Sequence, residues 1–253
     1  MTGASSGARS GPLPVPARAL AIGAHPDDIE FGAGATLAGW AAQGCEVSLL
    51  ICTDGSKGTW DANADIATLV ATRQAEARAA ATALGATGAV VFLGRVDGEL
   101  ENDRPSRSEV ARQIRELQPD VLLGHDPWKR YRLHPDHRAA GFLVCDALVA
   151  ARDPHFFSEH GIANHRPAAL LLFEADDPDH VEPVTEAGLA AKVAALGSHH
   201  SQYESTMFIS GDPANSKAEQ QRFESQIRTD LEEAGAWAGV PLAERFRFLA
   251  TDR

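Results

Sequence analysis

Short apolar runs alternate with longer helical patterns along most of the chain. Apolar runs bounded by turn residues predict buried strands, and apolar residues spaced three or four apart predict helices. The predicted strands are 17–24, 46–53, 89–93, 120–124 and 168–174, and the predicted helices are 32–44, 66–84, 106–117 and 135–151. This repeating order predicts a Rossmann-like α/β fold, with a mainly parallel sheet of order 3-2-1-4-5 and helices on both faces.

Two of the predicted helices have recognisable first residues. Ser106, with Glu109 three residues later, has the spacing of a capping box, so we expect a helix to begin there. Pro135 suits the first position of another helix, because its missing N–H would be unpaired at that position anyway.

The pattern is weaker after residue 174. Residues 181–184 are expected to form an edge strand, 185–197 a helix, and 216–234 a polar helix with one apolar face. The segment 236–249, which contains Trp237, Phe246 and Phe248, could cover the core, shape a pocket or form a contact in a homo-oligomer. The sequence leaves these three roles open.

Length and composition favour one large domain. The chain has 253 residues, of which 44% are hydrophobic, enough to bury a substantial core. Residues 1–16 are small, polar and proline-rich, and we expect a disordered tail there followed by a single α/β domain over 17–253.

Charge and cysteine usage exclude several classes of protein. The net charge is −12, and no predicted helix carries a stripe of Lys or Arg, so neither nucleic acid nor a membrane surface is an expected partner. Residues 1–16 lack the apolar core of a secretory signal, and no apolar stretch approaches the ~20 residues of a membrane span. The three cysteines lie in apolar runs without CxxC spacing, which is typical of a reducing compartment. We therefore expect a cytoplasmic protein without thiolate-bound zinc.

Two clusters of imidazole and carboxylate groups follow the first and fourth predicted strands. The first is Ala24-His25-Pro26-Asp27-Asp28, and the second is His134-Pro135-Asp136-His137. In a sheet of order 3-2-1-4-5 these strands are neighbours, and ligands bind outside their carboxyl ends. A catalytic zinc uses three protein ligands, and adjacent residues seldom point at one ion, so His25, Asp28 and His137 are the expected ligands.

The remaining groups of the two clusters are candidates for proton transfer. Asp27 would accept a proton from water whose pKa a metal lowers, and a protonated His134 would donate to a developing oxyanion. Asp136 is expected to fix the tautomer of His134 and to raise its pKa.

At these residues the chain resembles the PIG-L or LmbE-like family of zinc N-deacetylases. The resemblance covers roughly residues 18–205 and rests on the AHPDD and HPDH motifs, on residues 53–55 (TDG), on Arg73 with Glu76, and on residues 199–202 (HHSQ). It implies the same roles: His25, Asp28 and His137 hold zinc, with Fe²⁺ as the other candidate metal, Asp27 is the general base, and His134 is an electrophilic or acid group oriented by Asp136.

Three further residues are candidates for substrate binding. By the resemblance, Arg73 would bind sugar or phosphate-like oxygens, the alternative being a surface salt bridge to Glu76. His199 would line the pocket or belong to a capping turn. Trp128 would stack on a sugar face or anchor its loop. The chain departs from the mycothiol-pathway relatives at Arg132, where they have a tyrosine two residues before HPDH, so this substrate contact differs.

The leading hypothesis is a metal-dependent hydrolase that removes an N-acyl group, above all N-acetyl, from an amino sugar or a related small metabolite. The first alternative is an amidase of a thiol or sugar conjugate, and the second is a non-catalytic metal-containing module that binds a sugar. A third is a non-haem Fe(II) oxygenase, because two histidines and one carboxylate also form its facial triad, although usually with HxD spacing on a β-barrel.

Overall fold

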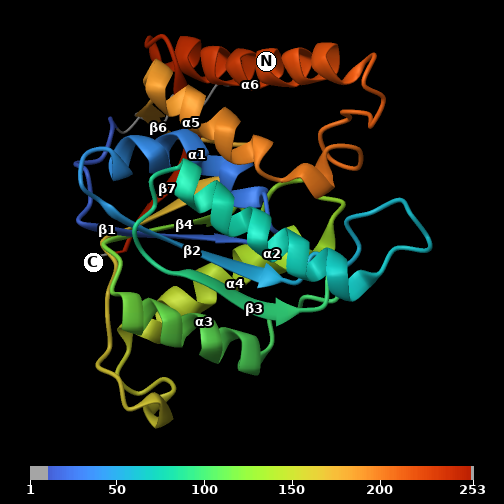
Figure 1. Ribbon diagram of the computed structural model, residues 1–253. Helices are drawn as coiled ribbons and strands as arrows, with labels where there is room; N and C mark the ends of the chain where they lie inside the picture. The colour runs from blue at the N-terminus through green and yellow to red at the C-terminus, as the bar shows by residue number, and fades with distance from the viewer. Residues whose placement is uncertain (1–10, 252–253) are drawn as a thin grey trace.

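The centre of the computed structural model, which describes residues 11–251, is a seven-stranded sheet with helices on both faces (Figure 1). The strands are β1 (Arg18–Gly23), β2 (Glu46–Thr53), β3 (Val90–Arg95), β4 (Val121–His125), β5 (Ala169–Phe173), β6 (His180–Pro183) and β7 (Ala243–Ala250). The helices are α1 (Asp28–Ala41), α2 (Ile66–Ala83), α3 (Arg104–Leu117), α4 (Pro135–Arg152), α5 (Glu186–Gly197) and α6 (Ser216–Ala238), with short 3₁₀ turns η1 (Ser158–His160) and η2 (His200–Gln202).

The strand order is β3-β2-β1-β4-β5-β7-β6. The first five strands are parallel, which confirms the predicted order 3-2-1-4-5 and the Rossmann-like arrangement. The sheet is then extended by β7, which runs antiparallel to β5, and by β6, which runs antiparallel to β7. Residues 180–183 form the predicted edge strand, but the strand between them and β5 was not predicted.

Successive side chains of the parallel strands serve two separate cores. On β1, Leu20 and Ile22 pack with residues of α3 and α4, whereas Ala19 and Ala21 pack with residues of α1. This alternation follows from the two-residue period of a strand. Figure 1 shows α3 and α4 on one side of the sheet and α1, α2, α5 and α6 on the other.

Two predicted helix starts are wrong by two to four residues. α1 begins at Asp28 and not at Gly32, so the first cluster, residues 24–28, runs directly into the helix. α3 begins at Arg104, because Asp103 is the capping residue and its side chain accepts a hydrogen bond of 2.8 Å from the Ser106 backbone N–H. Aspartate is as good a helix N-cap as serine, and here Asp103, which comes before Ser106, is the N-cap of α3. Pro135 is the first residue of α4, as predicted.

A glycine sets the distance between α1 and the sheet. A Cβ atom added to Gly32 would lie 2.5 Å from Cδ2 of the fully buried Phe173 on β5. Only a residue without a side chain allows the helix to pack this closely against the ring.

A buried arginine closes the carboxyl end of α4. The guanidinium of Arg115, on α3, donates hydrogen bonds of 2.8–3.2 Å to five backbone carbonyls, and its side chain is only 2% exposed. Two of the carbonyls belong to the last turn of α4, which has no intrahelical partners for them. The others belong to residues 153, 156 and 157.

Residues near both ends of the described chain contact the sheet. Leu13 donates its backbone N–H to Glu182 on β6 at 2.9 Å, so this part of the expected disordered tail contacts the sheet. The expectation for residues 1–10 lies outside the described residues. Near the carboxyl end of the chain, Ile227 and Leu231 of α6 are buried. Residues 243–249, whose role the sequence left open, belong to β7, a strand inside the sheet. None of the helices described is long and apolar enough to cross a membrane.

Candidate metal centre

The two histidine and aspartate clusters lie at the carboxyl ends of β1 and β4. These strands are paired in parallel, and each is followed by a short turn that leads into a helix, α1 or α4. α1 packs on one face of the sheet and α4 on the other, so the chain leaves this point in opposite directions. Such a reversal produces a crevice for ligands.

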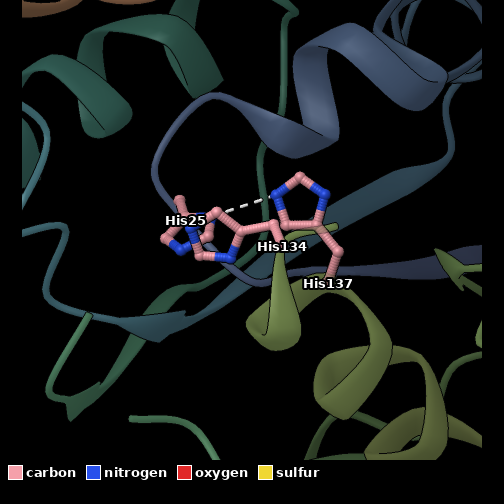
Figure 2. A group of neighbouring side chains, drawn as sticks. All are labelled: His25, His134 and His137. Atoms are coloured by element: carbon pink, nitrogen blue, oxygen red, sulfur yellow. Dashed lines mark hydrogen bonds between the residues drawn. The ribbon is translucent and has the colours of Figure 1, made fainter. Parts of the chain in front are cut away.

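Three side chains predicted to be metal ligands meet in this crevice. Nδ1 of His25 lies 3.3 Å from the Asp28 carboxylate and 3.2 Å from Nε2 of His137, and His137 Nε2 lies 3.3 Å from Asp28. Figure 2 shows the imidazoles of His25, His134 and His137 gathered together, with the contact between His25 and His137 dashed. Within residues 11–251, three groups of side chains could hold a metal ion: His25 with His134 and His137, Asp28 with His125 and His137, and His25 with Asp97, His134 and Asp136. The first two groups each contain two of the three predicted ligands.

The second nitrogen of His25 is held by two carboxylates. Its Nε2 lies 3.1 Å from Asp136 and 3.1 Å from Asp97. Burial favours the neutral imidazole, but the bonds to Asp136, Asp28 and Asp97 outweigh it and raise the pKa of His25 to about 12. The surroundings of His25 therefore favour positive charge, which either a proton or a metal ion on Nδ1 supplies.

The role predicted for Asp136 needs correction, because none of the hydrogen bonds and ion pairs described for residues 11–251 joins its carboxylate to the His134 ring. It is fully buried and accepts hydrogen bonds from the backbone N–H groups of Gly98 (2.6 Å) and Leu100 (3.2 Å) besides its contact with His25. Asp136 is the second residue of α4, and its side chain points back toward the end of β3. It therefore orients a predicted metal ligand and not His134.

His134 is oriented by the backbone instead. It is the N-cap of α4, and its Nδ1 accepts a hydrogen bond of 3.3 Å from the backbone N–H of Asp136. In the neutral ring the proton must then be on Nε2, which leaves a donor available. Burial and the charge of His25 lower the pKa of His134. The charge of Asp136 raises this pKa, as predicted, but is outweighed, so the expectation of a protonated His134 is wrong.

Asp27 is buried beside the predicted ligands without contacting a histidine nitrogen in any hydrogen bond described. Its backbone has φ 120°, a conformation that is strained for a residue with a side chain. Burial, with Asp28 next to it, raises the pKa of Asp27 to about 7, although the Arg73 guanidinium at 3.6 Å opposes this shift. A carboxyl group with this pKa can both accept and return a proton near neutral pH.

Arg73 is not on the surface, and its predicted alternative partner Glu76 does not pair with it. The guanidinium of Arg73 donates to the carbonyls of Gly55 (2.9 Å) and Pro26 (2.8 Å), which joins α2 to the turns after β1 and β2. Glu76 instead accepts hydrogen bonds from the backbone N–H and the hydroxyl of Ser201.

A second layer behind the ligands was missed by the sequence analysis. His125, the last residue of β4, lies with Nε2 3.1 Å from Asp28 and Nδ1 3.0 Å from Glu174. Glu174 also accepts a hydrogen bond of 2.6 Å from Arg132, whose Nη1 lies 3.0 Å from Nδ1 of His137. Arg132, which stands where the mycothiol-pathway relatives have a tyrosine, thus contacts Nδ1 of the predicted ligand His137.

These groups surround one pocket of about 420 Å³. Its residues come from the loops after β1, β2, β3, β4 and β5, from the helices α1, α2 and α4, and from residues 202–206 in and after the turn η2. They are His25, Asp27, Asp28, Phe31, Lys57, Gly58, Arg73, Asp97, His134, His137, Glu174, Gln202 and Thr206. A larger groove between α5 and α6 is lined by neither histidine nor cysteine.

Two residues expected to contact substrate are not on the pocket wall. Trp128 packs edge-on against Phe142 and lines a separate groove with Asp126 and Arg130. His199 is completely buried, with Nε2 3.7 Å from Glu30, and the η2 turn contributes Gln202 to the wall instead. The family resemblance identified the right turn but not which of its side chains faces the pocket.

The chain is similar to known deacetylases. Residues 20–148 match the family PIG-L: GlcNAc-PI de-N-acetylase. The chain is 31% identical to the diacetylchitobiose deacetylase of Thermococcus kodakarensis, over 92% of this chain and 83% of that protein. It is 34% identical to 1D-myo-inositol 2-acetamido-2-deoxy-alpha-D-glucopyranoside deacetylase 1 of Catenulispora acidiphila, over 64% of this chain and 58% of that one.

A solved structure agrees with the sequence matches. The N,N'-diacetylchitobiose deacetylase of Pyrococcus horikoshii, crystallised with its inhibitor MPG, superimposes with a TM-score of 0.81 at 28% identity, and the match covers 93% of this chain and 84% of that one. The family match contains both clusters of the crevice. From its sequence and its fold alike, this chain belongs to the PIG-L family of GlcNAc-PI de-N-acetylases.

Proposed function

We propose that the protein is a zinc-dependent N-deacetylase that hydrolyses the N-acetyl group of an amino sugar or a related small metabolite. The observation that carries this proposal is the placement of Asp27, a buried carboxyl group with a pKa near 7, beside three converging donor atoms in one pocket. The relatives named above act on N-acetylated sugars, which supports an amino sugar as substrate.

The distances between the three donors suit zinc. Zinc binds nitrogen and oxygen at about 2.0–2.1 Å in a tetrahedron, which places its ligand atoms roughly 3.3–3.4 Å apart. The two imidazole nitrogens lie 3.2 Å apart, and each lies 3.3 Å from Asp28, His25 from its Oδ2 and His137 from its Oδ1. Two imidazoles and one carboxylate also suit Fe²⁺. We therefore propose that these three residues hold the metal, with zinc as the leading candidate.

The remaining residues have distinct tasks in this proposal. The bound metal would supply Lewis acidity, which polarises the acyl carbonyl and makes water a stronger acid. Asp27 takes the proton from the attacking water and returns it to the leaving amine. His134 donates its Nε2–H to the developing oxyanion. Arg73, whose Nε has no hydrogen-bond partner within residues 11–251, binds a sugar oxygen.

The proposal also includes the cellular compartment of the protein and its oligomeric state. We place the protein in the cytoplasm, since its three cysteines are free, as in a reducing compartment. A homo-oligomer stays a prediction.

The test is release of acetate from a panel of N-acetylglucosamine derivatives by protein loaded with zinc or with Fe²⁺, in parallel with Asp27→Ala. We expect turnover by the parent protein, and a loss of at least about a hundredfold in the variant with one metal still bound per chain. Asp103→Asn is the matched control, because it removes a carboxylate at the start of α3 while keeping a capping residue. Unchanged turnover in Asp27→Ala contradicts the assigned base. Metal binding without turnover on any panel member would favour the amidase or the binding module.

A further inference from the structure

A buried ion pair lies against α1, the helix whose first residue is the predicted ligand Asp28. Nζ of Lys192, on α5, lies 2.6 Å from Oε1 of Glu244, on β7, and each residue is only 4% exposed. Lys192 also lies close to the α1 backbone, since a Cβ atom added to Gly34 would be 3.3 Å from Cγ of Lys192. This pair, which we call the α1 ion pair, thus lies where α1, α5 and β7 meet.

Both members of the α1 ion pair bind backbone groups of α1. Nζ of Lys192 donates a hydrogen bond of 2.6 Å to the carbonyl of Phe31. The Glu244 carboxylate accepts hydrogen bonds from the backbone N–H groups of Ala35 (3.2 Å) and Thr36 (2.8 Å). In a regular helix the Ala35 N–H would bond to the Phe31 carbonyl, so the pair binds both ends of one bond of the helical ladder. Its two charges therefore hold the backbone of α1 and not only each other.

These contacts lead directly to the turn that carries the proposed metal ligand and the proposed base. The Phe31 N–H donates a hydrogen bond of 3.1 Å to the carbonyl of Asp27, and the Phe31 side chain lines the metal-centre pocket. Two successive hydrogen bonds thus connect Lys192 to Asp27 through Phe31. Asp28 lies between the two residues that the second of these bonds joins.

The turn at Asp27 requires support on both sides. Asp27 has φ 120°, and a strained backbone of this kind persists only where the surrounding structure fixes it. On the side of β1, the Ala24 carbonyl accepts hydrogen bonds of 2.8 Å from both the backbone N–H and the hydroxyl of Thr53. On the side of α1, the α1 ion pair fixes the helix backbone from residue 31 onward.

We infer that Lys192 and Glu244 are positioning residues of the metal centre, which hold the start of α1 where Asp27 and Asp28 must lie. This inference rests on the proposed function, because it assigns the pair a role toward the proposed metal ligand. Neither Lys192 nor Glu244 lines the pocket, so both act through the backbone of α1. The late strand β7 then has a task in the site besides extending the sheet.

A pair that only joined the helices to the sheet would behave differently. Its loss would lower the stability of the fold and leave the zinc affinity of the folded protein unchanged. A positioning pair changes the zinc affinity even under conditions in which each variant is fully folded. The zinc Kd of the folded protein therefore distinguishes the two roles.

Two variants weaken the α1 ion pair to different extents. Glu244→Gln keeps the shape of the side chain but has one oxygen that can accept, so its NH₂ must face either Thr36 N–H or both Ala35 N–H and Lys192. Lys192→Met/Glu244→Gln also removes the donor to the Phe31 carbonyl and keeps the net charge of the parent protein. Each variant decides the question alone if the other does not fold.

Zinc Kd values would be measured at fixed pH by competition with a chromophoric chelator, at a temperature at which circular dichroism shows each variant folded. Groups that contact a metal ligand contribute about 10–100-fold to metal affinity, and this pair acts through the backbone. We therefore expect the zinc Kd to rise about tenfold in the double variant and about fivefold in Glu244→Gln. The second readout is hydrogen exchange of the Phe31 amide in the metal-free protein, which should become at least about tenfold faster in the double variant.

Glu182→Gln is the matched control. Glu182, on β6, is the cross-strand neighbour of Glu244 and is also 4% exposed. Its described hydrogen bonds join it to Leu13 and His180 and not to α1. The control should keep the zinc Kd and the Phe31 exchange rate of the parent protein.

The outcomes separate this inference from the proposed function. A zinc Kd within about twofold of the parent value in the folded variants overturns the inference, and so does an equal rise in Glu182→Gln. A parent protein that binds zinc but releases no acetate contradicts the deacetylase function alone. If the parent protein binds no zinc, the metal centre is contradicted, and the Phe31 exchange rate still shows whether the α1 ion pair holds the turn.

Discussion

The Asp136→Asn substitution distinguishes two roles for the second carboxylate of the HPDH motif. The carboxylate accepts hydrogen bonds from the N–H groups of Gly98 and Leu100 and lies 3.1 Å from Nε2 of His25. All three partners donate, and an asparagine has only one oxygen that can accept. One oxygen, Oδ2, accepts from both Gly98 and His25, and Oδ1 accepts from Leu100, so the amide NH₂ must face either the Leu100 N–H or both other donors.

The expected loss of metal affinity follows from this geometry. A hydrogen bond to a charged group contributes about 1.5–3 kcal/mol, and changes behind a metal ligand typically weaken metal binding about 10–100-fold. Asp97 contacts the same His25 nitrogen at 3.1 Å and still holds it in the variant. We therefore expect Asp136→Asn to raise the zinc Kd about tenfold, and the Asp97→Asn/Asp136→Asn double variant about a hundredfold.

Zinc Kd values would be measured at fixed pH by competition with a chromophoric chelator, after circular dichroism has shown that each variant is folded. His134→Ala is the comparison, because it should lower turnover and leave the zinc Kd near that of the parent protein. If Asp136 oriented His134, as the sequence suggested, Asp136→Asn would behave in the same way. A zinc Kd within about threefold of the parent value would refute the assignment of Asp136 to His25.

Three other predictions concern packing and the cysteines. Arg115→Met leaves five buried carbonyls without their charged donor and should lower the free energy of unfolding by about 3 kcal/mol in urea titrations; a loss below about 1 kcal/mol would contradict this. Gly32→Ala forces a Cβ against the Phe173 ring, and we expect a loss of about 1–3 kcal/mol in the same assay, with no change if the helix can move away freely. Burial raises the pKa of all three thiols, so Ellman's reagent at pH 8 should modify the folded protein far more slowly than the unfolded one. The thiols keep their protons in the folded protein but lose them in the unfolded chain above pH 9, the ordinary pKa of a cysteine. The free energy of unfolding should therefore fall as the pH rises above 9. Fast labelling of the folded protein would contradict both predictions. The pKa is about 11 for Cys45 and about 12 for Cys52 and Cys145.

The sequence predicted the parallel half of the sheet because that half repeats one unit. Each strand is a short apolar run followed by a helix, and the order 3-2-1-4-5 places the two histidine clusters side by side. β7 does not belong to this repeat. Its sequence, AERFRFLA, alternates only in part, and its neighbours in the sheet, β5 and β6, lie about seventy residues earlier in the chain. Nothing local indicates that a late strand is inserted between two earlier ones.

Asp97, His125 and Glu174, which surround the predicted ligands, were missed for a different reason. They also lie at the carboxyl ends of parallel strands, where the predicted ligands were found. Asp97 follows β3 by two residues, His125 ends β4, and Glu174 directly follows β5. Parallel strands bring their carboxyl ends to one edge, so all three were candidates. Which nitrogen of His25 faces a carboxylate, however, depends on side-chain directions that spacing does not determine. The same limit explains Asp136, whose neighbour in sequence is not its partner in space.

The carboxyl groups of the site separate into two kinds, and this separation supports the role of Asp27. Asp28, Asp97, Asp136 and Glu174 are all partly or fully buried, which opposes ionisation, yet each is paired with a histidine, and their pKa values are lowered. Asp27 is buried as deeply as Asp28 and Asp97, but the cation that pairs with it is Arg73 at 3.6 Å, whose hydrogen bonds go to backbone carbonyls, and its pKa is raised to about 7. Two environments within one pocket thus give fixed negative charges beside the predicted metal ligands, and one carboxyl group whose pKa lies at about 7. Acid–base catalysis requires this division, because a group that must take a proton and return it cannot also be held permanently ionised.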